Sequence, residues 1–387
     1  MTKEKGIPQI RFSGFTDTWE QREVSNVAMI STGGTPSTAI NEYWNPKQVP
    51  WLSSGEVHKK YITYTDDKIS NEGLNHSSAR MIKQNSVLIA LAGQGKTRGT
   101  VAINRISLST NQSIAAMTFA PDICPEFVFS NLESRYDELR KVSSGDGTRG
   151  GLNKQLVSEI QIPYTSLNEQ RKIGQFFTHL DRLITLHQRK YDKLTKVKKA
   201  MLEKMFPKNG SLYPEIRFKG FTDAWEQRKL EEVITVGNGM DYKHLSEGDI
   251  PVYGTGGYML SVDKALSYDK DAIGIGRKGT IDKPYVLKAP FWTVDTLFYC
   301  IPKEDYSLDF VYCIFQNVNW KEKDESTGVP SLSKVNINST DVKVPTLAEQ
   351  EKIGAYFAQF DNLITLHQRK LEKLKNIKKA CLEKMFV

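Results

Sequence analysis

The octapeptide LITLHQRK stands at residues 183–190 and again, letter for letter, at 363–370. Each copy lies inside a longer repeat, because residues 167–206 return as residues 347–386 and both segments end in the pattern KKA-LEKMF. A repeat of this length and spacing indicates an internally duplicated chain, and it decides the fold more than any local motif does.

A second repeat opens each half of the chain. QIRFSGFTDTW at 9–19 returns as EIRFKGFTDAW at 215–225. The segments between the opening and closing blocks, about 24–165 and 230–345, share almost no identity. The opening blocks are 206 residues apart and the closing blocks 180, so the first insert is about 26 residues longer. This excludes a solenoid of short units at a fixed period. It predicts one repeated scaffold that presents two different recognition surfaces.

The closing repeats are predicted to be long helices, because apolar residues recur in alternating steps of four and three. Each helix is expected to run for about 38 residues, or about 57 Å. Matching seams predict that the two helices pack as antiparallel partners; the alternatives are packing of each helix on its own insert only, or dimerisation of two chains. The seam residues are Ile173, Phe177, Leu180, Ile184, His187, Tyr191 and Leu194 in the first copy, and Ile353, Phe357, Phe360, Ile364, His367, Leu371 and Leu374 in the second.

Polar residues on these helices have simpler interpretations than metal binding or catalysis. His187 and His367 lie on the seams, where packing or hydrogen bonding is expected. The lysines of the first helix, which include Lys190, Lys198 and Lys204, lie mostly off the seam and are interpreted as a solvated face or a docking surface.

Both inserts are predicted to mix strands and helices. Strand-like runs broken by Gly, Ser and Asn come first, followed by helix-like runs at 125–142 and 309–318, a Gly-containing loop and a closing strand. Loop positions match across the 180-residue offset: Leu152 with Leu332, and Lys154 with Lys334. The inserts are therefore expected to share a fold. The predicted class is α/β (mixed α+β), with two globular domains, two long antiparallel helices and a pseudo-twofold internal repeat.

One segment invites an enzymatic interpretation. Residues 90–97, ALAGQGKT, fit the loose phosphate-loop pattern A-x4-G-K-[ST]. That mechanism needs a helix to begin at Lys96 and Thr97, so that its N–H groups hold phosphates. The following RGTVAINR favours a strand, so we predict a hairpin with a Gly-rich tip. The same hairpin is expected at 273–287, which has no phosphate-loop match. A shared position with unlike chemistry is typical of a recognition loop.

Composition favours a globular protein with a polyanionic partner. The 387 residues suffice for two or three domains, and the formal net charge is +8. No apolar run is long enough to span a membrane, and the first residues lack the apolar core of a signal peptide. The spacing of Cys124, Cys300, Cys313 and Cys381 shows no metal pattern, so free thiols and a cytoplasmic location are expected.

DNA binding, without catalysis, is the function that these features favour. Metalloprotease, serine-hydrolase and dinucleotide motifs are missing, as are the Asn-Pro-Pro-aromatic motif of adenine methyltransferases and the paired acidic motifs of nucleases. Arg and Lys recognise guanine, Asn and Gln recognise adenine, and all of them hold phosphates. The candidate DNA contacts are Gln94, Lys96, Thr97, Arg98, Thr148, Arg149 and Lys154 in the first insert, and Arg277, Lys278, Thr280, Lys334 and Asn336 in the second.

The repeated blocks resemble those of a known family. The pattern I-x-F-x-G-F-T-D-x-W-E-x-R at the openings, and P-x(1–3)-L-x-E-Q-x-K-I at the closings, is similar to the specificity (S) subunit of type I restriction–modification enzymes over 9–387. The resemblance implies target recognition domains within 1–165 and 211–345, followed by the long helices of 166–210 and 346–387. Each domain would read one half of a bipartite, asymmetric DNA site.

The same resemblance implies partners and their cofactors. Two methyltransferase (M) subunits, which carry S-adenosylmethionine and methylate adenine, would dock on the helices, where the implied seam positions are Ile173, Phe177, Leu180, Ile184, Ile353, Phe357, Phe360 and Ile364. Restriction (R) subunits would add ATP, Mg²⁺ and cleavage of double-stranded DNA. This chain itself would bind no cofactor or metal and contact no membrane. The rival interpretations are a stand-alone sequence-specific DNA-binding protein and, less favoured, a phosphate-loop nucleotide hydrolase.

Overall fold

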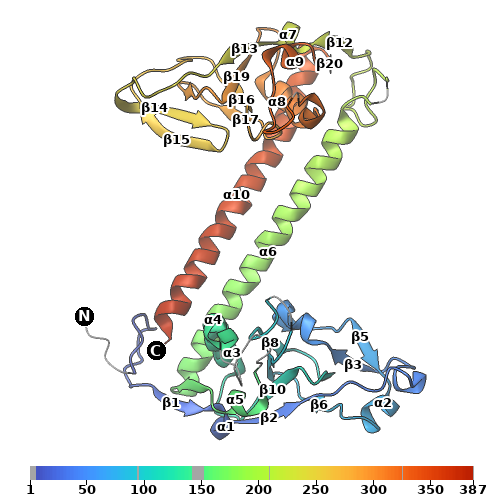
Figure 1. Cartoon of the computed structure of the whole chain (residues 1–387), viewed down its shortest axis with the longest axis vertical. Helices are drawn as coiled ribbons and strands as arrows, with labels where there is room; N and C mark the ends of the chain where they lie inside the picture. Colours follow the sequence, from blue (N-terminus) through green and yellow to red (C-terminus); the bar gives the residue numbers. More distant parts are fainter. Residues whose placement is uncertain (1–5, 94–95, 142–151, 209, 325, 387) are drawn as a thin grey trace. The chain divides into compact units, whose positions relative to one another are not determined.

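A computed structural model describes residues 6–93, 96–141, 152–208, 210–324 and 326–386 (Figure 1). The chain divides into two compact units. Unit 1 comprises Met1–Leu186 with Lys370–Val387, and unit 2 comprises His187–Arg369. Each unit therefore contains one insert and a part of both long helices. Within the described ranges, no helix is both long and apolar enough to cross a membrane.

The predicted long helices are confirmed as α6 (Leu167–Met205) and α10 (Leu347–Met385), each of 39 residues. In unit 1, Phe177 of α6 stacks on Phe386, and one turn later Asp181 binds Lys378. The residue numbers rise along α6 as they fall along α10, so the two helices run antiparallel there.

Unit 2 shows the same antiparallel pairing. His187 Nδ1 lies 2.8 Å from His367 Nδ1, and Lys198 Nζ lies 2.5 Å from Asp361 Oδ1. The predicted hydrogen-bonding role of the two histidines is confirmed. Lys198, however, is only 8% exposed, so its assignment to a solvated face was wrong. Its ammonium group needs the carboxylate of Asp361, which lies 163 residues further along the chain.

The inserts form mixed α/β structures, as predicted. Among its described residues, unit 1 has a five-stranded sheet, a four-stranded sheet and a two-stranded ladder. The five-stranded sheet has the order β2 (Ala28–Thr32), β10 (Ile114–Phe119), β7 (Val87–Ala90), β8 (Val101–Asn104) and β4 (Tyr61–Ile62). The four-stranded sheet has the order β5 (Asp67–Ile69), β3 (Val49–Leu52), β9 (Leu108–Thr110) and β6 (Met81–Ile82). The two-stranded ladder pairs β1 (Glu20–Glu23) with β11 (Gln161–Tyr164). The short helices are α1 (Val24–Val27), α2 (Asn71–Asn75), α3 (Pro125–Ser134), α4 (Tyr136–Lys141) and α5 (Lys154–Ser158).

Unit 2 repeats the central part of this arrangement. Its described residues form, in sheet order, β13 (Ile234–Asn238), β19 (Leu297–Pro302), β16 (Ala272–Gly276) and β17 (Tyr285–Leu287); β15 (Gly257–Val262), β14 (Glu247–Gly254) and β18 (Trp292–Thr293); and β12 (Glu226–Lys229) with β20 (Asp341–Val344). The short helices are α7 (Leu230–Val233), α8 (Leu308–Asn317) and α9 (Lys334–Asn338). The order β2-β10-β7-β8 thus matches β13-β19-β16-β17. The prediction that the inserts share a fold is confirmed.

One predicted helix is interrupted. The helix expected over 125–142 breaks at Arg135, between α3 and α4. At the break one guanidinium nitrogen of Arg135 donates to the Gln161 carbonyl at 2.5 Å, and the others bind Glu138. Sequence periodicity does not encode such a contact with a distant strand.

The repeated opening and closing motifs bind each other within each unit. In unit 1 the Arg11 guanidinium binds both carboxylate oxygens of Glu169, at 2.6 and 2.8 Å, and Trp19 Nε1 donates to the same carboxylate at 3.0 Å. In unit 2 the Arg217 guanidinium likewise binds both carboxylate oxygens of Glu349, each at 2.8 Å. These bidentate pairs fasten the opening segment onto the first turn of the long helix.

The glutamine after each of these glutamates fastens the insert to the helix. The side-chain oxygen of Gln170 accepts from the Cys124 N–H just before α3, and that of Gln350 accepts from the Ser307 N–H just before α8. A Cβ on Gly174 would lie 2.9 Å from the Phe127 nitrogen, so the helix approaches α3 closely. The Glu-Gln motif therefore specifies how each insert sits on its helix.

The acid stability of unit 1 is expected to depend on Glu169. Burial alone would raise its pKa, but hydrogen bonds from Arg11 and Thr165 outweigh burial and lower the pKa below its ordinary value of 4.5. A carboxylate with a lowered folded-state pKa stabilises the fold above its unfolded pKa and loses that contribution as the pH falls through the folded value. Melting of wild type and of Glu169→Gln between pH 7 and pH 3 should show the largest difference at pH 7 and a shrinking one below about pH 4.5. A constant difference would contradict this assignment.

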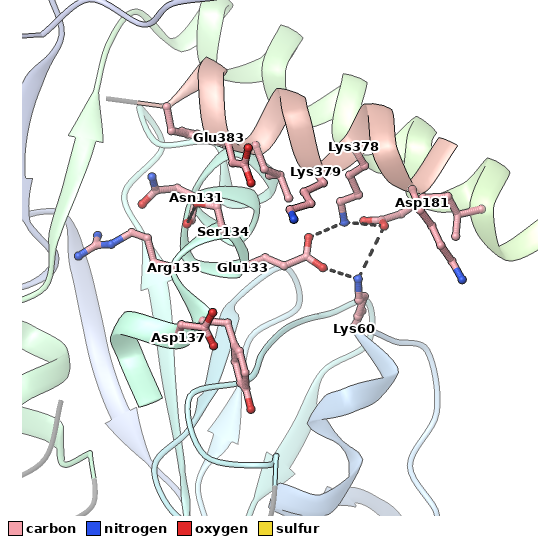
Figure 2. A pocket seen from close by; sticks show the side chains of 15 residues that line it. Lys60, Asn131, Glu133, Ser134, Arg135, Asp137, Asp181, Lys378, Lys379 and Glu383 are labelled. Atoms are coloured by element: carbon pink, nitrogen blue, oxygen red, sulfur yellow. Dashed lines mark hydrogen bonds and ion pairs between the residues drawn. The ribbon is translucent and has the colours of Figure 1, made fainter. Parts of the chain in front are cut away.

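A cluster of four charges joins insert 1 to both helices within unit 1 (Figure 2). Lys378 of α10 is 8% exposed and binds Asp181 of α6 at 2.6 Å. Glu133 of α3 binds both Lys378 and Lys60. Burial would raise the pKa of Glu133, but the two ammonium groups outweigh it and lower that pKa. A cavity of about 630 Å³ opens beside the cluster.

Unit 2 has a simpler version of this cluster. Lys198 and Asp361 are the repeat equivalents of Lys378 and Asp181, while Gln316 of α8 takes the place of Glu133. The side-chain oxygen of Gln316 is buried and has no hydrogen-bond partner among the described residues. The cluster between insert 1 and its helices therefore contains four charged side chains, whereas the equivalent cluster of unit 2 contains two, Lys198 and Asp361.

Candidate nucleic-acid interface

The tip of the β16–β17 hairpin in unit 2 gathers most of the predicted contacts of the second insert. The Arg277 N–H donates to the Thr296 carbonyl at 2.8 Å, and the Arg277 carbonyl accepts from Leu332 at 3.0 Å. Gly279, with a φ of +88°, donates to the Pro330 carbonyl at 2.8 Å. The loop before α9 therefore lies on the hairpin tip and fixes its backbone.

This arrangement forms a basic groove of about 490 Å³. Arg277 and Lys278 from the tip line it together with Lys334 from the first turn of α9. All three side chains are exposed, and within the described part of the chain none forms an ion pair with a carboxylate. Three unneutralised cations around one groove suit a polyanion.

The other two predicted contacts of insert 2 have different environments. The side-chain amide of Asn336 donates to the Lys323 carbonyl at 3.1 Å, so it is engaged inside the unit. Thr280 is half-buried, and its carbonyl oxygen lies so close to Gly276 that a Cβ on this glycine would be 2.1 Å from it. Sequence reasoning missed two exposed residues of the same region, Asn238 of β13, which lines the groove, and Asp295 beside Thr296. A lone polar residue, whether at the end of a strand like Asn238 or between strands like Asp295, gives no periodic signal that could have identified it.

The equivalent tip in unit 1 joins β7 to β8, which confirms the predicted hairpin. Residues 96–99 form a turn in which the Thr97 carbonyl accepts from the N–H of Thr100 at 3.1 Å. No helix begins at Lys96, so the geometry of a phosphate loop is missing from this described segment. Lys96 is exposed, and its carbonyl accepts from the Tyr136 hydroxyl at 2.9 Å. Thr97 and Arg98 are half-buried, while Gln94 lies outside the described residues.

The loop that carries the remaining candidates of unit 1 is described only in part. Thr148 and Arg149 lie outside the described residues. Lys154 is exposed at the start of α5, which is capped by the side chain of Asn153. Leu152 donates to the Leu91 carbonyl at 3.1 Å, as Leu332 does to that of Arg277. The predicted match of the two loops is confirmed.

The two tips nevertheless have unlike neighbours. In unit 1 a Cβ on Gly99 would lie 3.1 Å from the Arg140 nitrogen, so that tip packs on α4. In unit 2 the loop before α9 lies on the tip, where Lys278 and Ser331 form a β-bridge. The same topological position therefore presents a different chemical surface in each unit.

The seam residues of α6 and α10 pack mainly against other residues of this chain. Ile173, Phe177, Leu180, Ile353 and Phe357 are at most 6% exposed and belong to the cores of their own units. Ile184, Phe360 and Ile364 are half-buried.

Another set of apolar side chains on the same helices is exposed at repeat-equivalent positions. Leu186 and Leu366 are each 44% exposed, Leu363 is 45% exposed, and Val197 and Ile377 are 38% and 37% exposed. Apolar residues that recur in both copies without being buried are candidates for contacts with other subunits.

Groups suited to catalysis are scarce in what the structure describes. Burial raises the pKa of Cys124 to about 11, and it also raises the pKa values of Cys300 and Cys313. These thiols are therefore protonated at neutral pH. Within the described ranges, no group of three or more His, Cys, Asp or Glu side chains is placed to hold a metal ion.

Comparison with known families identifies the class of protein. The family described as "Type I restriction modification DNA specificity domain" matches residues 16–196 and 222–376, which are most of the chain and include both inserts. The chain belongs to this family.

Individual relatives agree with that assignment. The type I restriction enzyme MjaIX specificity subunit of Methanocaldococcus jannaschii is 25% identical over 231 residues, which cover 57% of this chain and 52% of that protein. That match thus spans about half the length of the relative. The MjaVIII specificity subunit of the same organism is 20% identical over 422 residues and covers 97% of this chain and 94% of its own length.

A solved structure shares the fold. The type I restriction–modification system S subunit from M. genitalium superimposes with a TM-score of 0.74 at 16% identity, covering 98% of this chain and 99% of that chain. The likeness agrees with the arrangement of strands and long helices described above.

Proposed function

We propose that this chain is the non-catalytic DNA specificity subunit of a type I restriction–modification complex. The observation that carries the proposal is the presence of two units with one strand order and one repeated frame, whose equivalent tips present different chemistry. Because the two units share a frame but differ in the chemistry of their hairpin tips, they suit two unlike half-sites, and therefore an asymmetric bipartite DNA sequence. Family membership and the net charge of +8 support a nucleic-acid ligand.

In this proposal the recognition domains lie within 1–165 and 211–345, and each reads one half-site. Arg277, Lys278 and Lys334 contact the second half-site. In the first half-site the contacts come from Lys96 on the equivalent hairpin tip and from Lys154, the repeat equivalent of Lys334. Thr97, Arg98, Thr280 and Asn336, which are half-buried, stay proposed contacts. The same holds for Gln94, Thr148 and Arg149, which lie outside the described residues. Cations that face phosphates supply the salt-dependent part of the affinity, and side chains that reach base edges supply the specificity.

The long helices, within 166–210 and 346–387, are proposed to set the spacer between the half-sites. Successive major grooves on one face of DNA are about 34 Å apart, a distance that a 39-residue helix of about 58 Å exceeds. Insertion of four residues into both helices would lengthen each by about 6 Å. The expected result is a longer spacer with unchanged half-sites.

The proposed partners are two methyltransferase subunits, which bring S-adenosylmethionine and methylate adenine, and restriction subunits, which bring ATP and Mg²⁺. Selection of bound fragments from randomised duplex DNA by the complex of this chain with its methyltransferase subunits tests the proposal. A bipartite motif supports it. Enrichment of a motif by the isolated chain alone would favour a stand-alone DNA-binding protein instead.

Docking of the methyltransferase is expected to depend on the apolar residues that the helices leave partly or wholly exposed, among them Leu183, which is half-buried, and Leu363, which is 45% exposed. The double variant Leu183→Asp and Leu363→Asp places a charge at two repeat-equivalent positions and should weaken co-purification of the methyltransferase at least tenfold, because each buried charge costs about 2 kcal/mol or more at an interface. The matched control, Leu183→Met with Leu363→Met, keeps the surface apolar and should assemble normally. Full assembly of the Asp variant would defeat the docking claim.

A further inference from the structure

A second hairpin of unit 2 ends beside the basic groove. Strands β14 and β15 are joined by a tight turn at Thr255 and Gly256, and Gly257 follows with a φ of +105°. A Cβ at Gly256 or Gly257 would meet no atom within 4 Å, so the turn projects into open space. The next side chain, Tyr258, is 64% exposed.

The exposed ring of Tyr258 is nonetheless held in place. It meets the ring of Tyr253 edge-on, with centroids 6.4 Å apart, and its hydroxyl lies 3.2 Å from that of Ser261. Tyr253 in turn packs against Tyr285, whose hydroxyl donates to the Gly254 carbonyl at 2.6 Å. A rigid aromatic side chain contributes contact area at a low cost in conformational entropy.

The hairpin end adjoins the basic tip. A Cβ on Gly276 would lie 3.3 Å from the Thr255 methyl group, and Gly276 is the residue before Arg277. The hairpin residues 251–261 carry no charge, whereas Glu247, Asp249 and Asp263 all lie toward its opposite end. The end that lies beside Gly276, the residue before Arg277, therefore carries an exposed aromatic ring and no carboxylate, a composition that suits a polyanion with stacked bases.

The geometry points to Tyr258 as a base-contacting residue of the half-site read by unit 2. Its ring would pack against a base while Arg277, Lys278 and Lys334 hold the neighbouring phosphates. Aromatic wedges beside cationic phosphate contacts are a general way for proteins to engage DNA bases. This inference rests on the proposed function and names the side chain through which one half-site is discriminated.

Unit 1 has no matching hairpin within its described residues. There β3 and β5 are joined by residues 53–66, and the exposed Tyr64 has Lys59 Nζ lying 4.3 Å above its ring. Because the Lys59 ammonium group already covers the ring of Tyr64, this ring presents a different surface from that of Tyr258. The effect of changing Tyr258 should therefore be confined to one half-site.

The test uses the assembled complex of the full chain with its methyltransferase subunits and a randomised duplex DNA pool. Tyr258→Ala should lower the affinity for the selected site about tenfold or more. It should relax base preference at adjacent positions of one half-site and leave the other half unchanged. Tyr258→Phe keeps the ring and should retain both properties. Because Tyr258 carries no charge, the salt dependence should stay as in wild type, whereas Arg277→Ala should reduce it by about one phosphate contact.

Three other outcomes would contradict either the inference about Tyr258 or the proposed function. Wild-type affinity and preference in Tyr258→Ala would overturn the inference, provided that the wild-type complex selects a bipartite motif. Loss of the methyltransferase from the Tyr258→Ala complex would also overturn it, since the ring would then be a protein contact. Failure of the wild-type complex to select any motif would reject the proposed function itself.

Discussion

Replacing Lys378 by methionine is expected to lower the free energy of unfolding of unit 1 by about 3–5 kcal/mol. Lys378 is 8% exposed and lies between Asp181 and Glu133. Methionine would leave two carboxylates facing each other with the single ammonium group of Lys60 to balance them. The cost arises from this uncompensated buried charge and exceeds the value of the lost hydrogen bonds.

Hydrogen exchange of the full chain measures this effect unit by unit. Amides of α3 and of the nearby part of α10 should lose protection in Lys378→Met, while amides of the unit 2 sheet should not. Lys379→Met, at an exposed neighbouring position, serves as the matched control. Lys198→Met, the repeat equivalent, should cost less, because its partner Asp361 is partly exposed and Gln316 replaces the second carboxylate. Equal costs at Lys378 and Lys198 would contradict the role assigned to the four-charge cluster.

Exchange of the first insert has the largest expected effect on function. Replacing residues 24–165 by the insert of another member of the family should change one half of the recognition sequence completely and leave the other half as it was. Because a single mismatched base pair costs about 1–3 kcal/mol, the hybrid should scarcely bind the original site.

The hybrid also tests the junctions. Arg11, Glu169 and Gln170 are retained, and a replacement insert with a similar helix start should dock through the same contacts. The spacer should remain constant, since the helices are unchanged. A hybrid with both half-sites altered would refute independent recognition by the two inserts.

Much of the fold could be predicted from the sequence, because the internal repeat indicates both the long helices and the equivalence of the two inserts. The seam spacing predicts α6 and α10, and the 180-residue offset that links Leu152 to Leu332 predicts the equivalence of the inserts. The Glu-Gln motif was visible as a repeat, but its partners were not. Contacts such as that of Arg11 with Glu169, 158 residues apart, depend on tertiary structure.

The candidate interface was harder to predict. The structure brings three of the predicted contacts, Arg277, Lys278 and Lys334, to one groove, and their contact with DNA stays a prediction. Tyr258, which we infer to contact a base, was not among the residues singled out from the sequence, since an aromatic residue near the start of a strand is usually buried in the core. Its exposure follows from the glycine turn that ends the hairpin, combined with the absence of any covering segment among the described residues. The helix α9 of five residues is too short for a periodic signal and depends on its Ser333 cap.

The most direct measurement is a map of modified adenines after co-expression of this chain with its methyltransferase subunit in a host free of adenine methylation. Single-molecule sequencing of the host genome would then report every methylated position. We predict one bipartite, asymmetric motif with methylated adenines, which disappears when either insert is deleted. Methylation at a continuous or palindromic motif, or methylation that survives deletion of an insert, would contradict it.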